Sequence, residues 1–85
     1  MEDSLSTREV GWLLDRSPGT VRQMIRDGEI DGVRIPSGFR VPRDEVLRLS
    51  RERIEEEAGR KLSDKELERL IDEVILTNET RLHEA

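Results

Sequence analysis

The chain has 85 residues and a mass of 9.9 kDa, enough for one small domain, and 33% of its residues are hydrophobic while 41% are charged. It contains no cysteine and a single histidine, which excludes disulfide frameworks and cysteine-based zinc sites and argues against histidine-based acid–base catalysis. No apolar run exceeds three residues, so no segment is expected to span a membrane. Glu2 and Asp3 stand where a secretory signal would carry basic residues, and the protein is therefore expected in the cytoplasm.

The net charge of −5 is unevenly distributed along the chain. Residues 1–50 hold eight arginines and nine acidic residues, whereas residues 51–85 hold seven basic and eleven acidic residues. Every cation of the first half is an arginine, the side chain best suited to bidentate contacts with phosphate or guanine. The acidity belongs mainly to the tail, and the first half remains a candidate for nucleic-acid binding despite the overall sign.

Two short helices separated by a tight turn are expected near the N-terminus. The first opens with a capping box at residues 6–9 and continues to about residue 15. Ser17 is a suitable N-cap for the second, Pro18 suits its first helical position, and Gly28 is placed to end it. A pair of short helices joined by three or four residues is typical of a helix-turn-helix.

The hydrophobic period then changes from helical to alternating. Apolar and β-prone residues at 32–35 and 39–42 flank the turn residues 36–38, and this pattern predicts a β-hairpin. A lone hairpin is unstable, so it must lean on the helices. A third helix is expected from residue 42 or 43 to residue 58, and a second capping box at residues 63–66 opens a last helix to about residue 81.

The order helix, turn, helix, hairpin, helix predicts a mainly α fold with a small β-hairpin, a winged helix-turn-helix followed by a C-terminal amphipathic helix. Residues 5–50 resemble the excisionase-type, MerR-like DNA-binding domain family. The resemblance rests on Ser17-Pro18-Gly19-Thr20-Val21, on Gly28-Glu29-Ile30, and on the run from Phe39 to Val46. We divide the chain into a DNA-binding domain over residues 1–58 and a C-terminal helical segment over residues 59–85.

The resemblance implies a sequence-specific double-stranded DNA-binding protein without catalytic activity, cofactor or metal. Such a protein would be a small transcriptional regulator or an excisionase-like recombination directionality factor. Its second helix would enter the major groove, and the hairpin wing would touch the backbone or the minor groove. The DNA-binding candidates that follow are Ser17, Thr20, Arg22, Gln23, Arg26, Arg34, Ser37, Gly38, Arg40 and Arg43. Arginine can bridge guanine O6 and N7, and glutamine can pair with adenine N6 and N7.

Several of these residues also have a purely structural interpretation. Arg22 and Arg26, spaced four residues apart, could be solvated helix-surface side chains. Arg40 and Arg43 could form ion pairs with Asp44 and Glu45. Trp12 and Phe39 are expected to pack against the domain, the latter holding the wing to the helices.

The last helix carries an apolar stripe too extensive for an isolated exposed helix. It could fold back onto the domain, pair with a second copy, or dock into another protein. Self-association is the first choice, since MerR-type regulators dimerise through a long C-terminal helix, and a homodimer or a cooperative array on DNA would follow. The alternative is an antitoxin-like or adaptor protein whose C-terminal helix binds a protein partner. The interface residues in either case would be Leu67, Leu70, Ile71, Val74 and Ile75.

Overall fold

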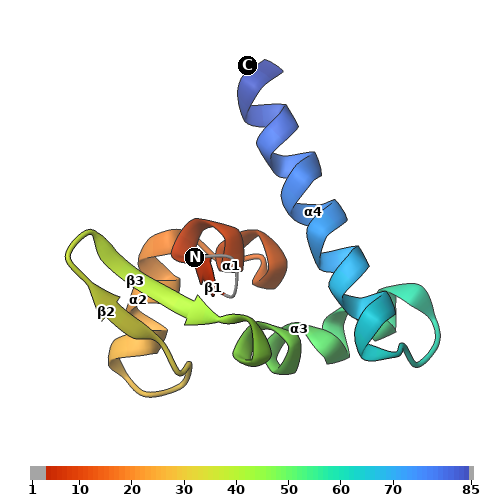
Figure 1. Ribbon diagram of the computed structural model, residues 1–85, viewed down its shortest axis with the longest axis horizontal. Coiled ribbons are helices and arrows are strands. Elements are labelled where there is room, and N and C mark those ends of the chain that lie inside the picture. The colour runs from red at the N-terminus through yellow and green to blue at the C-terminus, as the bar shows by residue number, and fades with distance from the viewer. Residues whose placement is uncertain (1–3, 85) are drawn as a thin grey trace.

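The computed structural model describes residues 4–84 (Figure 1). Its elements in chain order are β1 (Ser4–Ser6), α1 (Thr7–Leu14), α2 (Pro18–Arg26), β2 (Val33–Ile35), β3 (Gly38–Pro42), α3 (Arg43–Ala58) and α4 (Asp64–Glu84). The predicted fold class is confirmed: the protein is mostly helical, with a small antiparallel sheet and a C-terminal helix, as in a winged helix-turn-helix. In the part of the chain described, no helix is both long and apolar enough to cross a membrane.

The sheet has one strand more than the sequence predicts. β2 and β3 form the expected hairpin, but β1 pairs antiparallel with the other edge of β3, which gives the order β1-β3-β2. The pairing sets Leu5 of β1 opposite Val41 of β3, and both side chains are buried. Only three residues make up β1, so alternation over so short a stretch gives no detectable period. The added strand and the helices together supply the support that a lone hairpin lacks.

The helix ends form as the sequence predicts. The Ser6 hydroxyl accepts the N–H of Glu9 at 3.1 Å, and the Glu9 carboxylate accepts the N–H of Ser6 at 2.8 Å, which completes the capping box of α1. Ser17 caps α2 through a 3.1 Å bond from the N–H of Thr20. Gly28 has φ of 81°, the left-handed conformation that follows many helix C-termini.

A close backbone approach at the end of α1 requires glycine at position 11. Asp15 takes a left-handed conformation with φ of 56°, and the chain then turns so that the N–H of Arg16 donates to the carbonyl of Gly11 at 2.9 Å. A Cβ atom at Gly11 would lie 2.4 Å from the carbonyl oxygen of Arg16. That contact is too short, and its partner is backbone that cannot rotate away.

Replacing Gly11 by alanine is therefore expected to destabilise the protein by about 1–3 kcal/mol, the usual range for overpacking a well-packed site. The sign is opposite to that of helix propensity, which favours alanine over glycine by about 1 kcal/mol. Urea unfolding monitored by circular dichroism measures the difference. An unchanged or higher free energy of unfolding in Gly11→Ala would contradict this packing of the turn.

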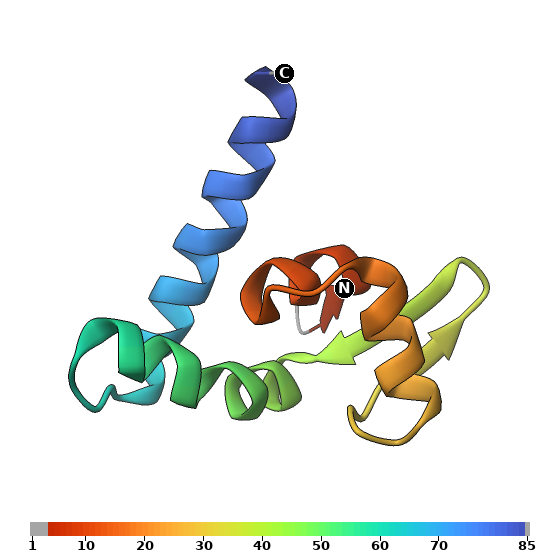
Figure 2. The same cartoon turned by 180° about the vertical axis from the view of Figure 1, so that it is seen from behind.

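The C-terminal helix α4 folds back onto the domain. It follows the turn after α3 and packs against α1 and α3 (Figure 2). The side chains of Leu67 and Ile71 are fully buried, and Ile75 is 9% exposed. These three side chains belong to the same core as the buried residues of the other helices and of the sheet. The sequence left open whether this helix folds back onto the domain, pairs with a second copy or docks into another protein, and in the structure it folds back. Three of the five predicted interface residues are therefore covered within a single chain.

Candidate nucleic-acid interface

The helix α2 presents a polar face to solvent. Val21 is fully buried, and Met24 and Ile25 are half-buried on the same side of the helix. At 3.6 residues per turn, Gln23 and Arg26 fall on the opposite side, and both are exposed. The outer face of α2 is thus centred on one amide and one guanidinium, the two groups that read base edges most often.

The other candidates on α2 lie at its edges. Thr20 is exposed at the first turn, where the Ser17 hydroxyl donates to its Oγ1 at 3.0 Å. Arg22 is half-buried on one flank of the outer face. The Gln23 side-chain amide donates to a carboxylate oxygen of Asp27 at 2.9 Å. No acidic residue lies in the first turn of α2, so its free N–H groups and positive dipole end are not neutralised by the chain.

The wing continues this polar face. Arg34 of β2 is paired with Phe39 of β3, so both side chains project to one side of the hairpin. The guanidinium of Arg26 lies over the Phe39 ring, 5.8 Å from its centroid, and this cation–π contact joins α2 to the wing. Phe39 is half-buried and not a core residue, because it packs beneath an exposed arginine. Ser37 is exposed in the turn, and Gly38 has φ of 139°, a conformation that favours glycine.

Two of the predicted contact residues are held by the chain itself. Arg40 donates from Nε to the Ser4 hydroxyl at 3.0 Å and from Nη2 to the Ser4 carbonyl at 2.9 Å, which fixes its side chain against β1. Arg43 pairs with Asp72 at 2.7 Å and with Glu68 at 3.5 Å. The Asp72 bond raises the pKa of Arg43 above its usual value. Arg43 thus links the start of α3 to α4.

Arg40 and Arg43 do not form the ion pairs with Asp44 and Glu45 that were the alternative to DNA contact in the sequence analysis. The buried carboxylate of Glu45 accepts the backbone N–H of Asp31 at 2.9 Å and pairs with Arg48 at 2.6 Å. These contacts, the Arg48 bond above all, lower the pKa of Glu45. Sequence neighbours on a helix do not face each other, so residues three or four positions apart or on other elements provide the partners.

Ion pairing divides the cations of the described residues into two groups. Between the described side chains, eight arginines have no carboxylate at ion-pair distance. Two of them, Arg69 and Arg81, lie on α4, and the other six belong to the helix-turn-helix and wing: Arg8, Arg16, Arg22, Arg26, Arg34 and Arg40. The arginines of α3 are all paired, as are Arg60 and Lys61 in the following loop. Arginines without an ion pair can neutralise phosphates without first breaking an internal ion pair.

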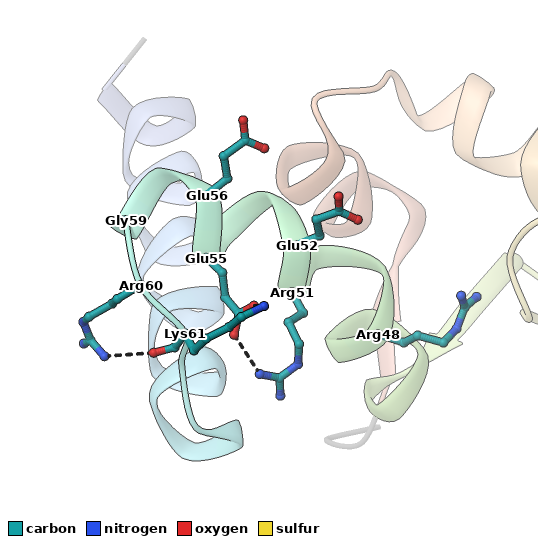
Figure 3. Close-up of a pocket in the computed structure, with 8 residues that line it drawn as sticks. All are labelled: Arg48, Arg51, Glu52, Glu55, Glu56, Gly59, Arg60 and Lys61. Atoms are coloured by element: carbon teal, nitrogen blue, oxygen red, sulfur yellow. Dashed lines mark hydrogen bonds and ion pairs between the residues drawn. The ribbon is translucent and has the colours of Figure 1, made fainter.

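A hollow of about 750 Å³ at the end of α3 is lined by cations that are paired, in contrast to the arginines of the helix-turn-helix and wing (Figure 3). Its cations are held by acidic residues of the same region: Arg51 pairs with Glu55 at 3.2 Å and also with Asp64. Glu55 in turn accepts the backbone N–H of Leu62 at 2.8 Å, which fixes the loop between α3 and α4, and this bond lowers the pKa of Glu55. The arrangement closes a loop and leaves little free positive charge for a phosphate.

The contacts of Glu66, next to this loop, predict that the free energy of unfolding depends on pH. Hydrogen bonds from Arg60, and from the backbone and side chain of Ser63, lower the pKa of Glu66 to about 2 from an ordinary value of 4.5. The folded form therefore favours the ionised carboxylate, and the stability it contributes is complete above pH 4.5 and lost as pH falls toward 2. We expect the free energy of unfolding to decline over this window and to decline less in Glu66→Gln. Identical pH profiles of the two proteins in urea unfolding would contradict the assignment.

Comparison with known proteins agrees with this geometry. The family model described as a helix-turn-helix domain matches residues 4–54, more than half of the chain. The chain therefore belongs to this family, which includes excisionase-type DNA-binding domains. No curated protein matches the chain, and no solved structure does.

Sequence reasoning missed one arginine that lies on this surface. Arg8, in the first turn of α1, is exposed and has no carboxylate partner among the described residues. The signal was present in the sequence, because a cation in the first turn of a helix lies at the unfavourable end of the helix dipole. Its neighbours on α2 and β3 could not be inferred without the fold.

Proposed function

We propose that this protein binds double-stranded DNA sequence-specifically and has no catalytic activity. It would act as a small transcriptional regulator or as an excisionase-like recombination directionality factor. The observation that carries the proposal is a set of six arginines without ion pairs on a helix-turn-helix domain. Among the described residues, these six lie in α1, in α2, in the turn between the two helices and in the wing. Three of the chain's twenty acidic residues, Glu45, Glu55 and Glu66, pair instead with arginines of α3 and the loop after it.

The arrangement suits α2 in the major groove with the wing beside it. Gln23 and Arg26 lie at the centre of the outer face, where they could reach base edges. Arg34 and the turn at Ser37 lie on the wing, where they could reach the backbone or the minor groove. The cation–π contact of Arg26 with the wing would fix the spacing between the two groups of contacts.

One copy offers a small contact surface, so we propose that useful affinity comes from a homodimer or from adjacent copies on DNA. The antitoxin-like or adaptor alternative gains no support from the structure. That alternative and a dimer through the α4 stripe both need Leu67, Ile71 and Ile75, which are already buried within the chain. The proposed copies would therefore contact each other through another surface.

Selection from a pool of random duplexes tests the proposal. We expect the purified protein to enrich a short motif, and repeated half-sites in that motif would indicate a dimer or stacked copies. A folded protein that enriches no duplex sequence, at low as well as at moderate salt, would contradict sequence-specific binding.

A further inference from the structure

A second hollow, of about 700 Å³, lies on the DNA-binding half of the molecule. Three arginines from three different elements line it: Arg8 of α1, Arg22 of α2 and Arg40 of β3. The turns near the C-terminal end of α4 border it with Glu79 and Leu82. Residues far apart in the sequence are thus brought around one concave surface.

An arginine at position 8 does not stabilise helix α1. It occupies the first turn of α1, where the helix dipole disfavours a cation, and no carboxylate of the described residues lies at ion-pair distance from its guanidinium. The adjacent Glu9 is engaged in the capping box, with its carboxylate bound to the N–H of Ser6. The free guanidinium of Arg8 is therefore available to an anion from outside the chain.

The other two arginines of the hollow differ from the residues expected to read bases. Arg40 is oriented by its two bonds to Ser4, and Arg22 is half-buried at the flank of α2, away from the centre of the outer face. Cations held at the edge of a reading helix suit the phosphodiester backbone, whose contacts set the position of the protein on the duplex.

We propose that Arg8, Arg22 and Arg40 form a binding site for the phosphodiester backbone of duplex DNA, with Arg8 as a contact that adds affinity but no sequence preference. The inference rests on the proposed function and extends it to a defined phosphate site. Glu79 lies at the rim of the same hollow and opposes the phosphate by like-charge repulsion.

The test compares Arg8→Gln with Arg69→Gln, which removes an exposed α4 arginine that has no carboxylate partner in the described part and does not line this hollow. Binding to the selected duplex and to an unrelated duplex of equal length is followed by fluorescence anisotropy over a salt series. We expect Arg8→Gln to weaken binding to both duplexes by a similar factor and to reduce the slope of log K against log salt by about 1. Its Tm should be equal to that of the wild type or higher, because the dipole penalty is removed.

A second pair of variants tests the effect of the carboxylate at the rim of the hollow. Glu79→Gln is expected to strengthen binding to both duplexes at low salt, whereas Glu73→Gln, an exposed carboxylate on the same helix outside the hollow, should leave binding unchanged.

Three results would overturn the phosphate site: Arg8→Gln binding like Arg69→Gln, Arg8→Gln losing affinity for the selected duplex only, or Glu79→Gln binding like Glu73→Gln. A wild-type protein that binds both duplexes equally, with the Arg8 and Glu79 effects intact, would retain the phosphate site and reject sequence specificity. A wild-type protein that binds neither duplex would reject both.

Discussion

Replacing Arg26 by alanine is expected to weaken binding to the selected duplex by roughly 5- to 150-fold, equivalent to about 1–3 kcal/mol, as for other arginines that read a base. Arg26 lies at the centre of the outer face of α2, is exposed, and contacts the Phe39 ring with its guanidinium. The substitution therefore removes a DNA contact with little loss of folding stability, since an exposed cation–π contact is worth about 0.5–1 kcal/mol. The selected motif should also relax at one position.

Arg69→Ala serves as the matched control for this experiment, because it removes an exposed arginine from α4 and so gives the same change in net charge. Affinities for the selected and an unrelated duplex, measured at one salt concentration, separate the two outcomes. Equal losses on both duplexes would assign Arg26 to the backbone, and an unchanged affinity would remove it from the interface.

Replacing Ile71 by alanine is expected to lower the free energy of unfolding by about 2–5 kcal/mol, the range for truncating a fully buried aliphatic side chain. Small domains are stable by only about 5–15 kcal/mol in total, so the loss should shift the unfolding midpoint strongly. The physical reason is that Ile71 lies in the shared core, on a helix that packs against α1 and α3. Urea unfolding at several protein concentrations measures it.

Leu76→Ala is the control on the same helix, because Leu76 is 65% exposed and its truncation should change stability by no more than about 0.5 kcal/mol. If the stripe instead formed a dimer, Ile71→Ala would act mainly through association, and the apparent stability would depend on protein concentration. A small effect of Ile71→Ala, or one that disappears on dilution, would contradict the folding-back of α4.

The features that the sequence predicts correctly are local ones. The capping boxes at Ser6 and Ser63 both form, and Gly28 ends α2 with a positive φ. Each depends on residues within a few positions of one another, so spacing alone carries the information. The hairpin also lies where the turn residues predict it, although its strands differ by one residue from the expected bounds.

The features that could not be predicted depend on contacts between distant segments. The pairing of β1 with β3 joins residues 34 or more positions apart, and the ion pairs of Arg43 join α3 to α4. The amphipathic stripe of α4 predicts burial but does not say against what, since the core, a second copy and a partner all satisfy the same pattern. The choice depends on whether α1 and α3 leave a matching apolar surface, which is a property of the assembled fold.

For the DNA-binding candidates too, local motifs were predicted correctly, whereas features that depend on the assembled fold were not. The family motif identifies α2 and the wing, but the exposure that separates Gln23 and Arg26 from Arg22 comes from the way α2 packs on the domain. Arg8 becomes part of the surface because α1, α2 and β3 border one hollow, and no motif on α1 indicated this.

The most direct test of the central claim, that DNA binds on the face of α2 and the wing, is a titration of ¹⁵N-labelled protein with the selected duplex, followed by amide chemical shifts. A chain of 85 residues is well suited to this measurement. We predict that the largest shift changes fall in residues 17–27 and 33–40, with little change in the loop between α3 and α4. Changes concentrated in that loop or in the buried part of α4, or no changes at all, would contradict the assignment.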